Sequence, residues 1–327
     1  MDQEKFEGYD VIGDVHGCAR TLMKLLEAMG YRKRAGVYTH LKRQAIFVGD
    51  IVDRGPHIRQ TMEVVYNMVD AGHAQMVIGN HEYSVYCYAT EDLRFQNTGQ
   101  TRYLREHNAR NNSQVEQTFE QFANHPHDLR EYLQWISELP LFLEMPNFRV
   151  VHACWDDPLI RAYRQKHGHN RLSPKIIVDS TDHSSLESRA INRLTRGIML
   201  PLPENHVMLS RDGFKRRHFR TKFWTSNPQT YGDIVFQPDP LPEHLIDRPL
   251  NEGEKAQLLQ YPKHEKLVFF GHYWLQGEPK VIKPNICCLD YSAVRFGRLA
   301  AYRIDEEKSV NPENYLWLYV DPAEQKS

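Results

Sequence analysis

Residues 9–17 read YDVIGDVHG, and residues 45–55 read AIFVGDIVDRG. Both segments begin with a short apolar run, which is typical of a buried strand, and then turn polar at a Gly-Asp pair. Residues 75–82, with the sequence QMVIGNHE, repeat this pattern with Gly-Asn in place of Gly-Asp. We therefore expect three strands at residues 9–12, 45–48 and 75–78, each followed by a polar loop.

Helical spacing of apolar residues separates these expected strands. Leucine and methionine recur at positions 22, 25, 26 and 29, before a stop at Gly30, and a second stripe occupies positions 58, 62, 65 and 69. Three strand–loop–helix units in a row predict an α/β sheet with helices on its faces. In such sheets ligands bind beyond the carboxyl ends of the strands, which is where the Gly-Asp and Gly-Asn pairs fall.

The rest of the chain divides into two expected insertions and a strand-rich end. Residues 91–145 are polar with a helical period, and predict a helical insertion of two helices around a break at residues 124–126. Residues 156–215 are mixed in character and predict a second insertion, a cap or lid of unassigned fold. Further strands are expected at residues 148–151, 266–270, 286–289, 298–304 and 315–320.

Length and composition limit the class of protein. The 327 residues equal roughly two domains at about 150 residues each, or one large α/β domain with insertions, and we expect a single domain over residues 1–327. The net charge of −1 makes a nucleic-acid partner improbable. Five cysteines without a Cys-x-x-Cys pair, no signal peptide and no long apolar run predict a cytoplasmic protein with no membrane partner. The oligomeric state stays open.

Polar residues at five strand exits predict a metal site. The loops after the first three strands contribute aspartate, histidine and asparagine, and two later segments, VHA at 151–153 and GH at 271–272, each add a histidine. Oxygen and imidazole ligands together suit Mn²⁺, Fe or Zn²⁺. The predicted ligands are Asp14, His16, Asp50, Asn80, His152 and His272.

This number of ligands fits two divalent ions. Asp14 and His16 lie two residues apart at one strand end and can reach one ion, and Asp50 can offer one oxygen to each ion. Asn80, His152 and His272 complete the second ion. Two ions about 4 Å apart can generate hydroxide near neutral pH and hold a phosphoryl group for in-line attack.

Residues beside these ligands have candidate roles in catalysis and substrate binding. His81 is the candidate general acid, Asp53 would hold its other ring nitrogen, and Arg54 would bind phosphate oxygens as a bidentate fork. Asn80 is a second candidate for substrate contact. Tyr273 could form an aromatic shelf for a base or an aryl group, although packing at that position is an equal alternative.

A basic run, KRRHFRTK at residues 215–222, is the most cationic part of the chain. Most such runs are solvated faces, but one arginine in the range 211–220 could reach the site and hold a free phosphate oxygen. The run does not indicate which arginine that would be.

The motifs together resemble the metallophosphoesterase, or calcineurin-like, superfamily. The form VDRG at 52–55 resembles its phosphoprotein-phosphatase-type branch, and Cys18 and the segment CLDYS at 288–292 are most similar to bacterial Ser/Thr phosphatases and dinucleoside polyphosphate hydrolases. The resemblance implies a β-sandwich of mixed sheets flanked by helices. It also implies the ligand roles given above, and manganese as the favoured metal.

The predicted function is a dinuclear metal-dependent phosphoesterase. It would hydrolyse a phosphomonoester or a phosphoanhydride through metal-bound hydroxide, and its partner would be a phosphoprotein, a phosphorylated small molecule or a nucleotide polyphosphate such as diadenosine tetraphosphate. Two alternatives remain: a phosphodiesterase of the same superfamily, and an inactive binding scaffold. Every expected ligand position holds a competent residue, which argues against the scaffold.

Overall fold

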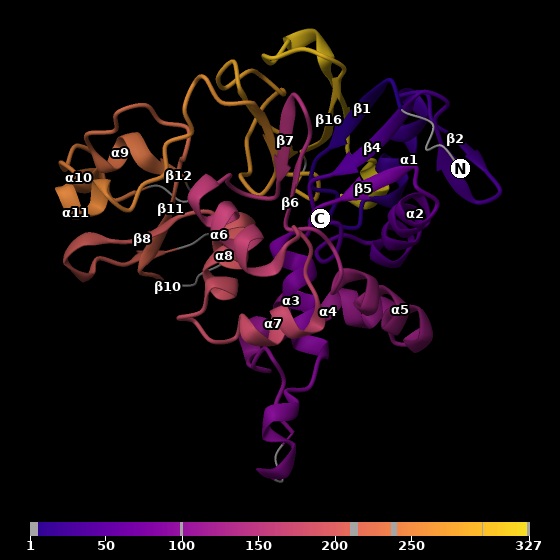
Figure 1. Cartoon of the computed structure of the whole chain (residues 1–327), viewed down its shortest axis with the longest axis horizontal. Coiled ribbons are helices and arrows are strands. Elements are labelled where there is room, and N and C mark those ends of the chain that lie inside the picture. The colour runs from indigo at the N-terminus through magenta and orange to yellow at the C-terminus, as the bar shows by residue number, and fades with distance from the viewer. Residues whose placement is uncertain (1–5, 99–100, 210–214, 237–240, 296, 326–327) are drawn as a thin grey trace.

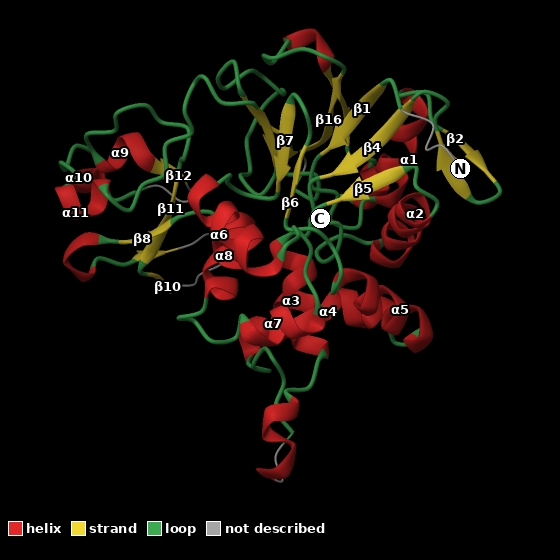
Figure 2. Cartoon of the chain, in the orientation of Figure 1, coloured by secondary structure: helices red, strands yellow, loops and turns green. Residues whose placement is uncertain are grey.

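The centre of the molecule is a pair of β-sheets, seen in a computed structural model that describes residues 6–98, 101–209, 215–236, 241–295 and 297–325 (Figures 1 and 2). The larger sheet has the strand order β15-β16-β1-β4-β5, with β17 paired to β16. Within it β1, β4 and β5 are parallel, whereas β16 runs antiparallel to β1. Its strands are β1 (Gly8–Ile12), β4 (Arg43–Phe47), β5 (Ala74–Met76), β15 (Asp290–Tyr291), β16 (Arg298–Ile304) and β17 (Tyr315–Tyr319).

The second sheet has the order β14-β13-β7-β6, with β7, β13 and β14 parallel and β6 antiparallel to β7. Alternation along the strands explains why the two sheets pack face to face. Val11 and Phe269 belong to the core between the sheets, whereas their neighbours Ile12 and Phe270 belong to the core beneath the helices. The strands are β6 (Phe142–Glu144), β7 (Phe148–Val151), β13 (Leu267–Phe270) and β14 (Ile286–Cys288).

Helices cover the outer faces of both sheets (Figure 1). α1 and α2 bury their apolar stripes against the larger sheet, with Leu22 and Met62 among the buried residues, and α6 and α8 pack beside β7. A short hairpin of β2 (Arg32–Arg34) and β3 (Val37–Thr39) follows α1. The helices are α1 (Ala19–Ala28), α2 (Ile58–Asp70), α3 (Asn80–Ala89), α6 (Asp157–His167), α7 (Pro174–Asp179) and α8 (Leu186–Arg196).

The segment at residues 91–145 contains the two expected helices, α4 (Ala109–Phe122) and α5 (Pro126–Ile136), and they meet at the expected break. A 3-10 helix, Leu93–Thr98, precedes them. The helical expectation is wrong at the end of the segment, because β6 pairs with β7 and belongs to the second sheet.

A small lobe with its own apolar core lies at one end of the molecule (Figure 1). This core runs from Ile198 to Leu250, so it continues past residue 215, where the second insertion was expected to end. The lobe contains β8 (Met199–Pro201), β9 (Met208–Leu209), β10 (Lys215–Arg216), β11 (His218–Thr221), β12 (Val235–Phe236), α9 (Tyr231–Ile234), α10 (Glu243–Ile246), α11 (Glu252–Lys255) and a 3-10 turn, Pro203–Asn205. Two further 3-10 turns, Pro312–Asn314 and Pro322–Glu324, flank β17.

Across the described part of the chain, the helices are all too short or too polar to cross a membrane. The five cysteines are all buried and unpaired. Cys287 and Cys288 belong to different cores on opposite faces of β14, as adjacent residues of a strand do.

Candidate active site

The carboxyl ends of five strands meet at one edge of the sandwich. In the larger sheet Ile12 is paired with Phe47, and Phe47 with Met76, so the loops that follow β1, β4 and β5 leave the sheet side by side. In the second sheet Val150 is paired with Phe269, which brings the ends of β7 and β13 together. The six predicted metal ligands are all buried at this edge.

Asp50 lies at the centre of the cluster. Its Oδ2 atom is 3.3 Å from His152 Nε2 and 3.7 Å from His16 Nε2. The Nδ1 atoms of these histidines each lie 2.8 Å from a backbone carbonyl oxygen, of Val52 for His16 and of Val48 for His152. These carbonyls accept a hydrogen bond from Nδ1–H and orient the rings so that Nε2 faces Asp50, as in metal sites whose histidines are held by outer partners.

Two sets of possible metal-ligating atoms share Asp50. One set combines Asp50 with His16 and His81, and the other combines it with His152 and His272, with all atoms of a set within 4.8 Å of one another. Asp14 lies outside both sets at that distance, but its Oδ2 accepts the backbone N–H of His272 at 3.0 Å. The amide of Asn80 lies 2.7 Å from His272 Nδ1.

Buried polar atoms without partners show that the cluster fits a bound cation. Asp14 Oδ1, His272 Nε2 and Asp290 Oδ2 are buried and have no hydrogen-bond partner among the described residues. Unpartnered buried acceptors are costly in a folded protein. Carboxylate and imidazole acceptors grouped around one shared aspartate match the ligand preferences of Mn²⁺, Fe and Zn²⁺.

The acidic residues of the cluster have strongly shifted pKa values. Burial, and then the charges of Asp290 and Asp50, raise the pKa of Asp14 well above its ordinary value. Burial also raises the pKa of Asp50, but His152 and His81 outweigh it and hold that pKa well below its ordinary value. The pKa of Asp290 is raised chiefly by burial. Cations near these carboxylates would favour their charged forms.

Asp290 is a site residue that the sequence analysis missed. It is the first residue of β15, its side chain is buried, and its negative charge is close enough to raise the pKa of Asp14. The only available signal was its place in the CLDYS segment, because no Gly-Asp or Gly-His pair marks it.

Several site residues have strained backbone conformations. His16, Asp50, Asp53, Arg54 and His272 all have positive φ angles, between 45° and 69°. Non-glycine residues rarely adopt this left-handed region, and such strain is concentrated at functional sites, where the surrounding structure maintains it.

Glu82 fixes the loop that carries Asp50. Its Oε2 accepts the backbone N–H groups of Asp50 and Gly79 at 2.8 and 2.9 Å, and its Oε1 accepts those of Ile51 and Val52 at 2.8 and 3.2 Å. One buried carboxylate therefore connects the loop after β4 to the start of α3, which carries Asn80 and His81.

Replacing Glu82 with glutamine is expected to lower the free energy of unfolding by about 1–3 kcal/mol, because the new NH₂ group would face two buried N–H donors. Urea denaturation followed by circular dichroism measures this change. Glu116, exposed on α4, supplies the matched control Glu116→Gln, for which no change is expected. An equal loss in both variants would contradict the structural role of Glu82.

His81 forms a chain of contacts at the start of α3. Its Nδ1 lies 2.6 Å from Asp53 Oδ2, and its Nε2 lies 3.1 Å from a terminal nitrogen of Arg54. Asp53 in turn accepts a hydrogen bond from the hydroxyl of Thr118 on α4. The helical insertion thus positions the predicted His81–Asp53 pair, and nothing in the sequence around Thr118 indicated this.

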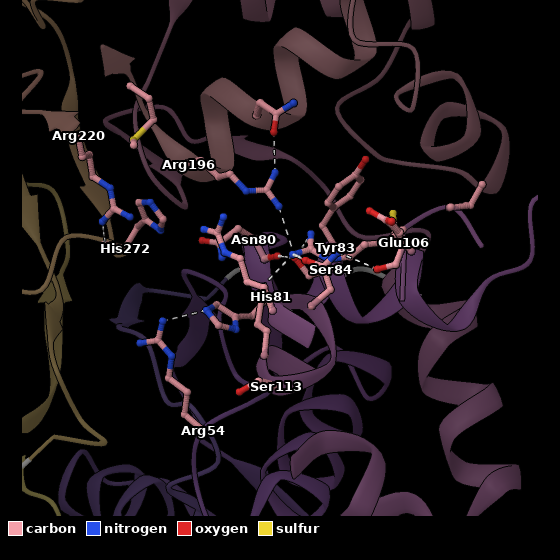
Figure 3. A pocket seen from close by; sticks show the side chains of 18 of the residues that line it. Arg54, Asn80, His81, Tyr83, Ser84, Glu106, Ser113, Arg196, Arg220 and His272 are labelled. Atoms are coloured by element: carbon pink, nitrogen blue, oxygen red, sulfur yellow. Dashed lines mark hydrogen bonds between the residues drawn. The ribbon is translucent and has the colours of Figure 1, made fainter. Parts of the chain in front are cut away.

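A cleft of about 1010 Å³ opens over these residues (Figure 3). Asn80, His81 and His272 lie on its wall, as do residues of the helical insertion, of α8 and of the small lobe. Among the described residues its lining holds one acidic side chain, Glu106, and seven arginines: Arg54, Arg105, Arg110, Arg196, Arg216, Arg220 and Arg295. The cleft is therefore strongly cationic although the chain is nearly neutral.

Two candidate substrate-binding side chains, Arg54 and Tyr273, lie in different environments. Arg54 lines the cleft, and its guanidinium lies 5.0 Å from the ring centre of Trp274. Of the two alternatives for Tyr273, the structure shows packing and contradicts the aromatic shelf. Its ring is fully buried against Phe223, Trp224 and Phe236, and its hydroxyl donates to the Thr221 carbonyl. Trp274, not Tyr273, is on the cleft wall.

Two arginines of the basic run at residues 215–222 lie on the cleft wall. Arg216 and Arg220 line it, and Arg220 donates to the backbone carbonyl of His272 at 2.8 Å. Arg217 is not on the cleft wall, and Arg211 lies outside the described residues.

A comparison with protein families gives the class of protein to which this arrangement of sheets and buried polar residues belongs. Residues 9–273 match the calcineurin-like phosphoesterase family, and the chain belongs to this family. Membership confirms the predicted resemblance to the calcineurin-like phosphoesterases.

Among similar proteins is the bis(5'-nucleosyl)-tetraphosphatase PrpE [asymmetrical] of Geobacillus sp. (strain WCH70), 31% identical over 150 residues, which are 44% of this chain and 55% of that protein. The protein of the same name from Oceanobacillus iheyensis is 33% identical over 145 residues, 44% of this chain and 54% of that one. The chain thus spans about half the length of these curated relatives. A solved yeast Ser/Thr phosphatase structure, from Saccharomyces cerevisiae, aligns over 98% of this chain and 81% of its own, at 13% identity and a TM-score of 0.49.

Proposed function

We propose that this protein is a dinuclear metal-dependent hydrolase of phosphomonoesters or phosphoanhydrides. The observation that carries the proposal is the shared position of Asp50 between two sets of metal-ligating atoms. One carboxylate between two sets is the arrangement that places two cations close enough to act on one phosphoryl group.

The proposed ligands are those predicted from the sequence. Asp14, His16 and Asp50 would hold one ion, and Asp50, Asn80, His152 and His272 the other, with Mn²⁺ as the proposed metal. Bound there, the two cations would supply positive charge for the phosphoryl group and lower the pKa of water. The negative charge of Asp290 would help to hold the cations.

His81 is proposed to give its proton to the leaving oxygen. Asp53 accepts the Nδ1–H bond and stabilises the positive charge of a protonated ring. Arginine only donates hydrogen bonds, so Nε2 is the acceptor in its contact with Arg54. Transfer of Arg54 to the phosphate oxygens would free Nε2 to take a proton from water, and His81 would then give that proton to the leaving oxygen. Asp53, Arg54 and His81 then act on one substrate together.

Nucleotide polyphosphates are the favoured substrate class, with phosphoproteins as the alternative. The cleft has many arginines, which bind phosphate oxygens as forks, and it is long enough to contact the helical insertion and the small lobe as well as the site. The relatives named as tetraphosphatases point the same way. We also propose a cytoplasmic location, because buried unpaired cysteines suit a reducing compartment.

Removal of metal is expected to abolish turnover, and reloading with Mn²⁺ is expected to restore it together with about two ions per chain. The test uses chelator-treated protein, metal quantification, and a panel of p-nitrophenyl phosphate, its bis-ester, phosphopeptides and diadenosine tetraphosphate.

The outcomes of this test distinguish the proposed function from the phosphodiesterase and the inactive scaffold. Metal-dependent turnover that prefers the bis-ester would indicate the phosphodiesterase. Protein that neither binds metal nor turns over any compound would favour the inactive scaffold. Full activity after complete metal removal would contradict the proposal.

A further inference from the structure

A second group of cationic side chains lies one helical turn from the candidate active site. Ser84 follows Asn80 by four residues on α3, about 6 Å along the helix axis, and its hydroxyl donates to the Asn80 carbonyl. Two guanidinium groups converge on the Ser84 oxygen, Arg105 at 3.2 Å and Arg196 at 3.4 Å. Figure 3 shows Arg196 reaching toward Ser84 from the opposite wall.

Among the residues that the structure describes, the hydrogen-bond acceptors around Arg105 are all neutral. Its second terminal nitrogen donates to Asn111 Oδ1 and Gln114 Oε1, each at 2.9 Å, and its buried Nε has no partner among the described residues. Among the described residues, neither Arg105 nor Arg196 forms an ion pair with a carboxylate. Burial, and then the nearby charge of Arg196, lowers the pKa of Arg105. Two like charges kept together without a counterion are costly, and a bound anion would offset that cost.

The backbone around Arg105 is fixed to α3 before any ligand binds. The N–H of Arg105 donates to the Cys87 carbonyl at 3.0 Å. The ring of His107 is stacked between those of Tyr88 and Tyr103, at centroid distances of 3.8 and 4.0 Å. Such a fixed arginine loses little freedom on binding, which favours affinity.

We infer that Arg105, together with Ser84 and Arg196, forms a second phosphate subsite, which binds a phosphate linked in a chain to the one cleaved at the metal site. The inference rests on the proposed function and deepens it, because it selects substrates with consecutive phosphates. Arg110, on α4, also lines the cleft and adds to its positive charge.

This geometry favours a polyphosphate chain over a phosphorylated protein side chain. A single phosphate held at the metal ligands leaves the second subsite one helical turn away without a partner. A linear chain of phosphates presents further anionic oxygens along its length, and arginine forks bind such oxygens strongly. Ser84 adds a hydroxyl between the two guanidinium groups.

The test compares the full-length protein with Arg105→Gln, using inorganic tripolyphosphate and orthophosphate as probes. With Mn²⁺ in excess, isothermal titration is expected to show about 10- to 100-fold weaker binding of tripolyphosphate to the variant, and no change for orthophosphate. Arg105→Lys keeps the charge but loses the bidentate fork, so its affinity for tripolyphosphate should lie between that of the unmodified protein and that of Arg105→Gln. Arg102→Gln is the matched control, since Arg102 is an exposed arginine of the same insertion outside the cleft lining.

A kinetic comparison separates the subsite from the proposed function. The ratio of kcat/KM for tripolyphosphate to that for p-nitrophenyl phosphate should fall at least about tenfold in Arg105→Gln, with equal melting temperatures. Unchanged tripolyphosphate binding and an unchanged ratio in an active enzyme would overturn the subsite and leave the hydrolase intact. Absence of turnover with both compounds, with the difference in binding retained, would overturn the proposed function and leave the subsite intact.

Discussion

Replacing Asp50 with asparagine is expected to abolish turnover and to lower the bound metal from about two ions per chain. The Oδ2 atom of Asp50 is the common neighbour of His16 and His152, so one substitution affects both sets of ligands. Loss of an outer partner alone costs about 10- to 100-fold in metal affinity, and loss of a shared ligand charge should cost at least as much. Metal quantification after dialysis and a steady-state assay measure both effects.

The control for this variant is Asp70→Asn, because Asp70 is an exposed carboxylate at the end of α2. It should retain metal and activity. A fully active Asp50→Asn protein with two bound ions would contradict the dinuclear proposal. The backbone N–H of His81 donates to Asp50 Oδ1 at 2.9 Å, so a melting curve must show that the start of α3 is intact.

Replacing His81 with alanine is expected to lower kcat by about 10²- to 10⁴-fold, the usual contribution of a general acid, with metal content unchanged. The loss should be smaller for p-nitrophenyl phosphate than for an alkyl phosphate, because nitrophenolate leaves without needing a proton. Steady-state kinetics on the two esters measure the difference.

The control is His127→Ala, at an exposed histidine of α5, which should leave kcat unchanged for both esters. Equal losses on good and poor leaving groups would remove His81 from the acid role. Loss of metal from His81→Ala would instead make His81 a ligand, since its Nε2 belongs to the same set as His16 and Asp50.

Local sequence was sufficient for the strands and their exits. The strand expected at residues 9–12 and the helical stripe at positions 22, 25, 26 and 29 depend on apolar spacing between neighbours in the chain. They correspond to β1 (Gly8–Ile12) and to α1 (Ala19–Ala28) with its C-terminal cap, Met29. The position of Asp14 or Asp50 directly after a strand is also a local property. That is why the candidate ligands could be named before the fold was known.

Residues that act through distant contacts could not be found in this way. Thr118 is 65 positions from Asp53, and no local pattern links a threonine in a polar helix to an aspartate in a loop. Asp290 and Asp14 come from opposite ends of the chain, and they meet at one edge of the larger sheet only because β15 and β1 both pair with β16. Tyr273 and Trp274 are adjacent aromatic residues, and only the packing around the turn at His272 decided which one faces the cleft.

The sequence by itself determined the family, the order of strands and loops, and the chemistry of the metal ligands, because each of these depends on residues close together in the chain. Only the tertiary structure decided where the charge lies. A net charge of −1 gave no sign of a cationic cleft, yet folding brings seven arginines from separate segments to one cavity with a single glutamate. Electrostatic fields depend on distances in space, and those distances are set by how the two sheets, the helical insertion and the small lobe pack around the strand ends.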